Sequence, residues 1–347
     1  MHRSGASLLK RTLDGWSGAP WIVAYHRVVE DFAMAAAESI PATLISRAML
    51  ERQLDWIGRR FEFVSLDDID DRLRRGARFR RPAAAVTFDD GYADVYEQAF
   101  PILKARGIPA ALFVVSDLID TRTPPLFDRL HLLLRRAWGR WPSPGTELAR
   151  LIADTGLDVP KSFADGGPPE PLRATRVLLE GLKAASLGRL AAALRERVGW
   201  DDEAAARHRP LSGAMLRALS AAGMTIGSHS RTHALLTLED SRTVVEEATG
   251  SRRALEASVG TPVRHFAYPN GWFDGTTIAA VQAAGYRCAY TSCRHRDPSR
   301  PRLTLPRTLL WENSGLDASD RFSPAVMGCQ ADGTFPWLAG CPLAHPL

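Results

Sequence analysis

Two pairs of residues in the sequence have the types and spacing that metal-dependent hydrolysis needs. Asp89 stands next to Asp90, and His229 lies four residues before His233. Neighbouring carboxylates raise each other's pKa unless a positive charge compensates. Imidazoles four residues apart can face the same way, as on one helical turn. One carboxylate and two imidazoles, with a position left for water, form the ligand set of catalytic zinc. The second carboxylate is then free to act as a base toward that water.

A third stretch, RHFAYPNG at 264–271, offers supporting groups. Arg264 can pair with a carboxylate and fix its orientation. Tyr268 precedes a proline, which holds its backbone extended, so an N–H there could face a developing oxyanion. Taken by itself, the stretch also fits a strand that leaves into a Pro-Asn-Gly turn.

Short apolar runs alternate with helical patterns along most of the chain, which predicts an α/β fold with a parallel sheet. Length and strand number favour an irregular (β/α) barrel, with a doubly wound open sheet as the alternative. Asp89 and His229 each end such a run, and functional groups of barrels lie at the C-terminal ends of strands. The expected strands are 21–26, 61–66, 83–88, 109–115, 224–229, 263–269, 286–292 and 302–310.

The middle of the chain departs from this alternation. Residues 116–210 contain Pro/Gly-rich stretches and helical patterns but no clear strand, which indicates a helical insertion. We therefore expect one domain over 1–347, interrupted by that insertion and ending in an irregular tail at 312–347. No apolar run approaches the length of about 18 residues that spans a bilayer.

The chain carries a net charge of +5, and six arginines fall within residues 71–82. Such a run is usually a solvated surface, but it is also a candidate for peripheral contact with an anionic membrane face or a phosphate-bearing substrate. No recognition motif or aromatic-interleaved basic stripe suggests nucleic acid. The N-terminal residues lack the apolar core of a secretory signal, so we expect a cytoplasmic protein, with the inner membrane face as a candidate peripheral location.

The stretches TFDDGY, HSRTH and RHFAYPNG, in this order, resemble the first three motifs of the polysaccharide deacetylases, carbohydrate esterase family four with the NodB homology domain. The resemblance implies an irregular (β/α) barrel and a metal-dependent enzyme that removes N-acetyl groups from amino-sugar glycans. It implies Asp89 as general base and Asp90, His229 and His233 as metal ligands. It further implies that Arg264 orients Asp89 and that the Tyr268 N–H lines the oxyanion site. Zinc is the default ion, and imidazole ligands also suit nickel and cobalt.

One departure from the family pattern concerns the general acid. Many members supply it as a histidine near the C-terminal strand, where this chain reads LTLPRTLLWENSG. His26 ends the first predicted strand, and the first and last strands of a closing barrel are neighbours, so we expect His26 to take this role.

Two alternative functions stay open: a metal amidohydrolase acting on a non-sugar amide, and a glycan-binding homologue without catalysis. An N-acetylglucosamine-type glycan, including a lipid-linked exopolysaccharide precursor, is the expected substrate.

Overall fold

The computed structural model describes residues 19–163, 168, 170–292 and 295–335. Its core is a nearly closed barrel of parallel strands, so the predicted barrel is confirmed and the open sheet is excluded. The strand order around the barrel is β10-β9-β8-β7-β6-β5-β1-β11. These strands are β1 (Trp21–Tyr25), β5 (Ala83–Phe88), β6 (Ala110–Val114), β7 (Thr225–Ser228), β8 (His265–Ala267), β9 (Cys288–Thr291), β10 (Leu305–Pro306) and β11 (Thr308–Leu309).

The two ends of the sheet, β10 and β11, are joined in the chain by a single residue. β10 pairs with β9 and β11 pairs with β1, while only Arg307 separates β10 from β11. The predicted last strand is therefore two short strands that lie on either side of a seam. The predicted strand at 61–66 is reduced to β4 (Glu62–Phe63), which pairs beside β5.

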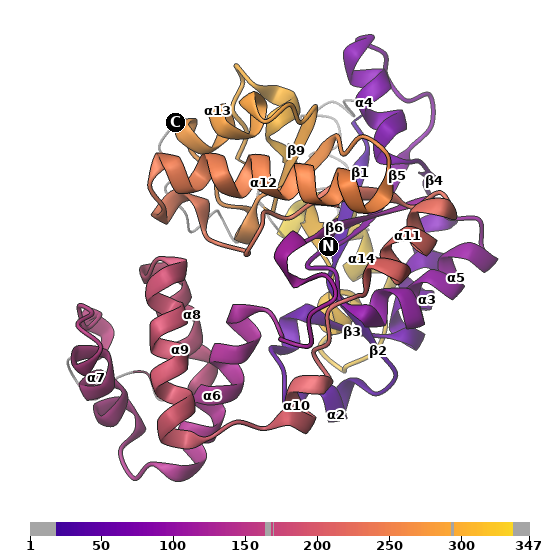
Figure 1. The fold of residues 1–347 in the computed structure, drawn as a ribbon. Helices are drawn as coiled ribbons and strands as arrows, with labels where there is room; N and C mark the ends of the chain where they lie inside the picture. The colour runs from indigo at the N-terminus through magenta and orange to yellow at the C-terminus, as the bar shows by residue number, and fades with distance from the viewer. Residues whose placement is uncertain (1–18, 164–167, 169, 293–294, 336–347) are drawn as a thin grey trace.

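Helices cover the outside of the barrel (Figure 1). In α3 (Arg47–Gly58), Leu50, Leu54 and Ile57 are buried, and the Ser46 hydroxyl accepts a hydrogen bond from the Met49 N–H at the helix start. Such a cap stabilises a helix by about 1 kcal/mol. The covering helices are α3 (Arg47–Gly58), α4 (Leu66–Arg74), α5 (Phe100–Ala105), α11 (Gly213–Ala221), α12 (Ser241–Val259) and α13 (Gly275–Ala283).

The insertion forms a helical subdomain with its own apolar core, which stands apart from the barrel in Figure 1. Leucines such as Leu134, Leu178 and Leu190 are fully buried between its helices, and each contributes about 1.5–3 kcal/mol by leaving water. The helices are α6 (Leu126–Arg140), α7 (Pro144–Asp154), α8 (Pro171–Gly181), α9 (Ala184–Val198) and α10 (Asp202–Ala206).

Smaller elements complete the chain. The tail, for which the sequence predicted no regular structure, contains α14 (Pro324–Ala331), capped by the Ser323 hydroxyl, and residues 336–347 lie outside the described part. Among the described residues, no helix combines the length and apolarity needed to cross a membrane. Next to the barrel, α2 (Phe32–Ala36) accompanies a two-stranded sheet of β2 (Arg27–Val29) and β3 (Leu44–Ser46).

Candidate active site

The C-terminal ends of three strands bring the predicted groups to one rim of the barrel. Asp89 follows β5, His229 follows β7 and His26 follows β1. Two of these residues extend the sheet by one hydrogen bond: the Asp89 N–H donates to the Tyr25 carbonyl and the His229 N–H donates to the Val114 carbonyl, each at 2.9 Å. The sheet therefore fixes where both side chains start.

Asp90, His229 and His233 form a compact cluster. Asp90 Oδ1 lies 3.5 Å from His229 Nε2 and 3.4 Å from His233 Nε2. One donor atom from each of the three residues lies within 4.8 Å of the others. His229 and His233 face the same point, but they do not lie on a helical turn as we expected. β7 ends at Ser228, and the two histidines lie on a loop with positive φ angles at Ser230 and His233.

The hydrogen bonding of this cluster fits a cation. His229 Nδ1 lies 2.7 Å from the Ala267 carbonyl oxygen and donates to it, which leaves a lone pair on Nε2 facing Asp90. Both Asp90 oxygens are buried, and neither accepts a hydrogen bond from any described residue. Buried polar atoms without partners are rare and costly, so a metal ion at this point would satisfy all three groups.

The electrostatics of the cluster lead to the same conclusion. Burial raises the pKa of Asp90 well above its ordinary value, and the Asp89 charge raises it further. Burial lowers the pKa of His229 to about 4 and lowers that of His233 as well. A protein that holds these groups together without a cation must neutralise its carboxylate, whereas a bound cation favours the carboxylate and neutral imidazoles.

Asp89 is held by Arg307 in the barrel seam. The two terminal guanidinium nitrogens of Arg307 donate to the two Asp89 oxygens at 2.7 Å each, and one also donates to the Thr87 hydroxyl at 3.2 Å. Burial alone would raise the pKa of Asp89, but the charge and hydrogen bonds of Arg307, together with the nearby His229 and His26, outweigh burial and keep that pKa below its ordinary value. Asp89 therefore stays ionised and oriented.

His26 lies near enough to this ion pair to interact electrostatically with Asp89 and Arg307. β1 runs between β5 and β11. Burial lowers the pKa of His26, the Asp89 charge opposes that shift and the Arg307 charge adds to it. The imidazole is thus close enough for both partners of the ion pair to influence its protonation.

A family model described as polysaccharide deacetylase matches residues 76–160 and 197–289, about half of the chain. The chain belongs to this family. Asp89, Asp90, His229 and His233 all lie within the matched residues, whereas His26 and Arg307 lie outside them.

Individual relatives agree with this assignment. Over 100 residues the chain is 30% identical to a poly-beta-1,6-N-acetyl-D-glucosamine N-deacetylase of Escherichia coli K12; the match covers 28% of this chain and 14% of that protein. Two solved structures share the fold: the deacetylase PplD of Streptococcus pyogenes in complex with acetate, at 16% identity and a TM-score of 0.55, and IcaB from Ammonifex degensii, at 18% and 0.54. Each of these two alignments covers 90% of this chain and 97% of the other.

Two predictions from motif matching are wrong in this family member. Arg264 does not reach Asp89, because it precedes β8 and so lies at the N-terminal rim, where it is 3.6 Å from Asp67. The partner of Asp89 is Arg307 instead. The Tyr268 N–H does not serve as an oxyanion donor either, because it donates to the Tyr290 carbonyl at 3.0 Å and so continues the sheet.

The arginine-rich segment 71–82 lies at the N-terminal rim too. It leads from α4 into the start of β5, at the end of the strand opposite Asp89. Arg74 pairs there with Asp70 and Asp71. The segment does not line the candidate site.

Residues of α12 and of the insertion support the site, and no sequence pattern indicated them. Glu247 of α12 accepts hydrogen bonds from the Arg231 and Thr232 N–H groups at 2.8 and 3.0 Å, which fixes the loop that carries His233. Phe127 of α6 has its ring centre 4.8 Å from that of His233. These contacts depend on tertiary packing, so local spacing could not have found them.

Asp128, next to Phe127, lies near Asp90 of the cluster. Its Oδ2 accepts a hydrogen bond of 2.5 Å from the Tyr92 hydroxyl, and its charge is one of the causes that raise the pKa of Asp90. The first turn of α6 therefore covers the candidate metal centre from the side of the insertion.

Proposed function

We propose that this protein is a metal-dependent N-deacetylase of glycans that contain N-acetylglucosamine. The observation that carries the proposal is the buried Asp90 carboxylate, which lies between two imidazoles, accepts no hydrogen bond from the described residues and stands beside a second, ionised carboxylate. The relatives include an N-deacetylase of poly-beta-1,6-N-acetyl-D-glucosamine. That protein is matched over only 14% of its length, so its substrate is part of our proposal.

Asp90, His229 and His233 would hold the ion. When bound, a divalent ion such as Zn²⁺, Ni²⁺ or Co²⁺ would polarise the acetamide carbonyl and lower the pKa of a water molecule. Asp89 would accept the proton of the attacking water, since Arg307 keeps the carboxylate ionised and oriented. His26 would deliver a proton to the departing amine. Burial lowers the pKa of this imidazole, and the nearby Asp89 charge counteracts part of that shift.

We further propose that the glycan is a short or lipid-linked precursor. The net charge of +5 favours substrates that carry negative charge. The cytoplasmic location stays a prediction of the sequence.

Acetate release tests the activity directly. Protein loaded with Zn²⁺, Ni²⁺ or Co²⁺ would be incubated with β-1,4- and β-1,6-linked N-acetylglucosamine oligomers, and with N-acetylated amino acids as non-sugar amides. We expect acetate from the oligomers and a loss of about 10²–10⁴-fold in Asp89→Asn, because a general base contributes that much. Asp67→Asn, a carboxylate at the opposite rim, serves as the matched control and should keep its activity.

Metal content separates the roles of the two aspartates. By elemental analysis, Asp90→Asn should lose the ion and Asp89→Asn should retain it. A loaded wild-type protein that releases no acetate from any oligomer would overturn the proposal, as would a fully active Asp89→Asn variant.

A further inference from the structure

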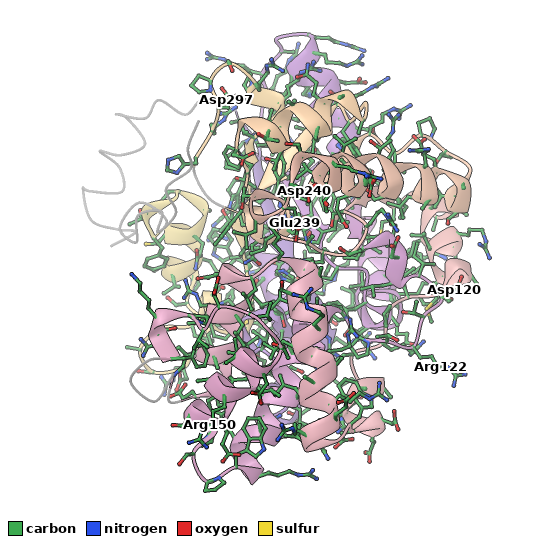
Figure 2. The ribbon with its side chains drawn as sticks, turned by 60° about the vertical axis from the view of Figure 1, so that its left-hand side comes forward. Asp120, Arg122, Arg150, Glu239, Asp240 and Asp297 are labelled. Atoms are coloured by element: carbon green, nitrogen blue, oxygen red, sulfur yellow. The ribbon has the colours of Figure 1, made fainter. Side chains whose placement is uncertain are left out.

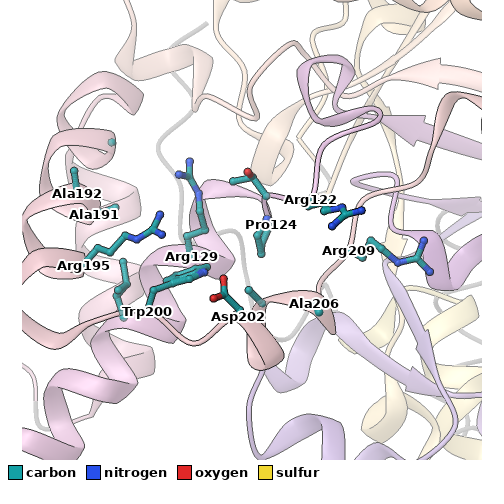
Figure 3. Close-up of a pocket in the computed structure, with 14 residues that line it drawn as sticks. Arg122, Pro124, Arg129, Ala191, Ala192, Arg195, Trp200, Asp202, Ala206 and Arg209 are labelled. Atoms are coloured by element: carbon teal, nitrogen blue, oxygen red, sulfur yellow. The ribbon is translucent and has the colours of Figure 1, made fainter.

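A second candidate site lies where the insertion meets the barrel. A cavity of about 950 Å³ is bounded by the loop before α6, the first turn of α6, α9 and α10 (Figure 3). Arg195 and Trp200 line it on the side of α9, and Arg122 and Arg209 line it on the side toward the barrel. A cavity of this volume accommodates a drug-sized or disaccharide-sized ligand.

Arg129 is the most unusual lining residue. Its Nε atom is buried, and within the described ranges that atom has no hydrogen-bond partner and no carboxylate forms an ion pair with the side chain. Burial lowers the pKa of this guanidinium, and the Arg195 charge lowers it further. The side chain as a whole is only partly buried, so the charge keeps some contact with solvent in the cavity while its Nε atom does not. By contrast, the buried Arg27 and Arg307 each pair with an aspartate.

Most of the other cationic side chains of the cavity also lack an acidic partner among the residues that the structure describes. In the part of the chain that the structure describes, Arg122 and Arg195 form no ion pair, and Arg209 pairs with Glu97 at 2.6 Å. Asp202 is the single acidic residue among the described residues that line the cavity. The cavity thus concentrates positive charge that the protein itself leaves largely uncompensated.

Trp200 adds an apolar surface to this charge. The Arg195 guanidinium lies over the Trp200 ring, 5.4 Å from its centre. Aromatic rings combined with a few placed polar groups are typical of small-molecule sites. The lining therefore suits a ligand with one anionic end and one flatter, less polar part.

We propose that this cavity binds a phosphate group carried by a saccharide. Guanidinium groups match phosphate oxygens with paired hydrogen bonds, and an anion would compensate Arg129. The cavity adjoins the candidate metal centre through α6: Phe127 contacts His233, and Arg129, two residues later, projects to a different side of the same helical turn. The saccharide part rests on the proposed function, whereas phosphate binding does not.

Calorimetric titration of the metal-loaded full chain with N-acetylglucosamine 1-phosphate tests the site. The neutral methyl glycoside of N-acetylglucosamine is the ligand control. We expect the phosphate ester to bind more tightly, with an affinity that falls as salt rises. Arg129→Met and the more exposed Arg195→Met should each weaken binding at least about tenfold, since each removes charge-assisted hydrogen bonds to the phosphate.

Arg150→Met is the matched control for these variants. Arg150 lies on α7 of the same helical subdomain but does not line the cavity, and Figure 2 shows it well away from Arg122. Binding to Arg150→Met should equal that of the wild type. Equal affinity of the wild type and both cavity variants would overturn the proposal, as would an absence of binding.

Two further measurements distinguish a ligand site at Arg129 from a structural role of this residue and from binding at the metal centre. Without ligand, Arg129→Met should melt at a slightly higher temperature than the wild type, because it removes a partly buried charge that has no ion-pair partner among the described residues. A lower melting temperature would mean a structural role. Asp90→Asn should still bind the phosphate ester while it releases no acetate. Loss of binding in Asp90→Asn would put the phosphate at the metal centre and overturn the proposal, without contradicting the deacetylase function.

Discussion

The barrel rim and the cavity of the insertion each hold a charged group without a partner among the described residues, and the two groups have opposite charge. At the rim, Asp89 is fully paired with Arg307, while Asp90 has no hydrogen-bond partner within the described part of the chain. In the cavity, the Nε atom of Arg129 is buried and has no hydrogen-bond partner among the described residues. The two sites adjoin the same turn of α6, one with donors suited to a cation and the other with donors suited to an anion. In this molecule, a charge that is paired, such as that of Asp89, is held in a fixed orientation for a chemical step. A charge without a protein partner in the described ranges instead indicates where a ligand binds.

Arg307→Met should have the largest effect, because it turns a paired charge at the rim into an unpaired one. Removing one partner of a buried ion pair costs about 3–5 kcal/mol. We expect the free energy of unfolding, measured in urea, to fall by about that amount. The double variant Asp89→Asn/Arg307→Met should recover part of the loss, since no charge is then left buried alone.

Arg264→Met is the control that distinguishes the two arginines. Its ion pair with Asp67 is partly exposed, so the unfolding free energy should change by less than about 1 kcal/mol. If both arginine variants lost the same unfolding free energy, the Asp89–Arg307 pair would contribute no more to stability than the exposed Asp67–Arg264 pair.

His26→Gln should affect rate without affecting stability. A general acid contributes at least about 10²-fold, close to 3 kcal/mol in the activation free energy. We expect kcat for acetate release to fall by that factor while metal content and melting temperature stay near those of the wild type. An active His26→Gln enzyme would show that another group protonates the amine.

A further predicted effect concerns the insertion and its response to acid. His131 of α6 is buried, with Nδ1 3.2 Å from the Thr175 hydroxyl, and burial lowers its pKa to about 4. The unfolded imidazole binds a proton below about pH 6.5, so between about pH 6.5 and 4 the unfolded state holds more protons and stability falls as pH falls. Between pH 7 and pH 5 the loss should be about 2 kcal/mol.

The variant His131→Asn keeps a hydrogen-bonding side chain but cannot titrate. Urea unfolding at both pH values should show a smaller loss for this variant than for the wild type. An identical loss would assign the acid sensitivity to other groups.

The barrel and the rim were predictable because they follow local rules. Runs such as 83–88 and 224–228 are apolar and bounded by turn residues, and the polar residues after them meet at one rim of any parallel barrel. The same rule explains the error at Arg264, which comes before its strand rather than after it and so belongs to the opposite rim. Tyr268 lies at the correct rim, but sheet pairing extends to its N–H.

Arg307 and the cavity could not be predicted in this way. β10 and β11 have two residues each, too few for a periodic pattern, and the arginine between them looks like an interruption. The arginines of the cavity come from segments nearly ninety residues apart, between Arg122 and Arg209. Only the packing of the helices on one another brings them to one place.

The seam residue also has a consequence for biosynthesis. Arg307 lies 218 residues after Asp89 in the chain, so a polypeptide still emerging from the ribosome holds Asp89 at the rim of an unclosed barrel without its arginine partner. Domains generally fold as units during synthesis. Enzyme activity should therefore appear late and abruptly, once the ribosome has released the last two strands.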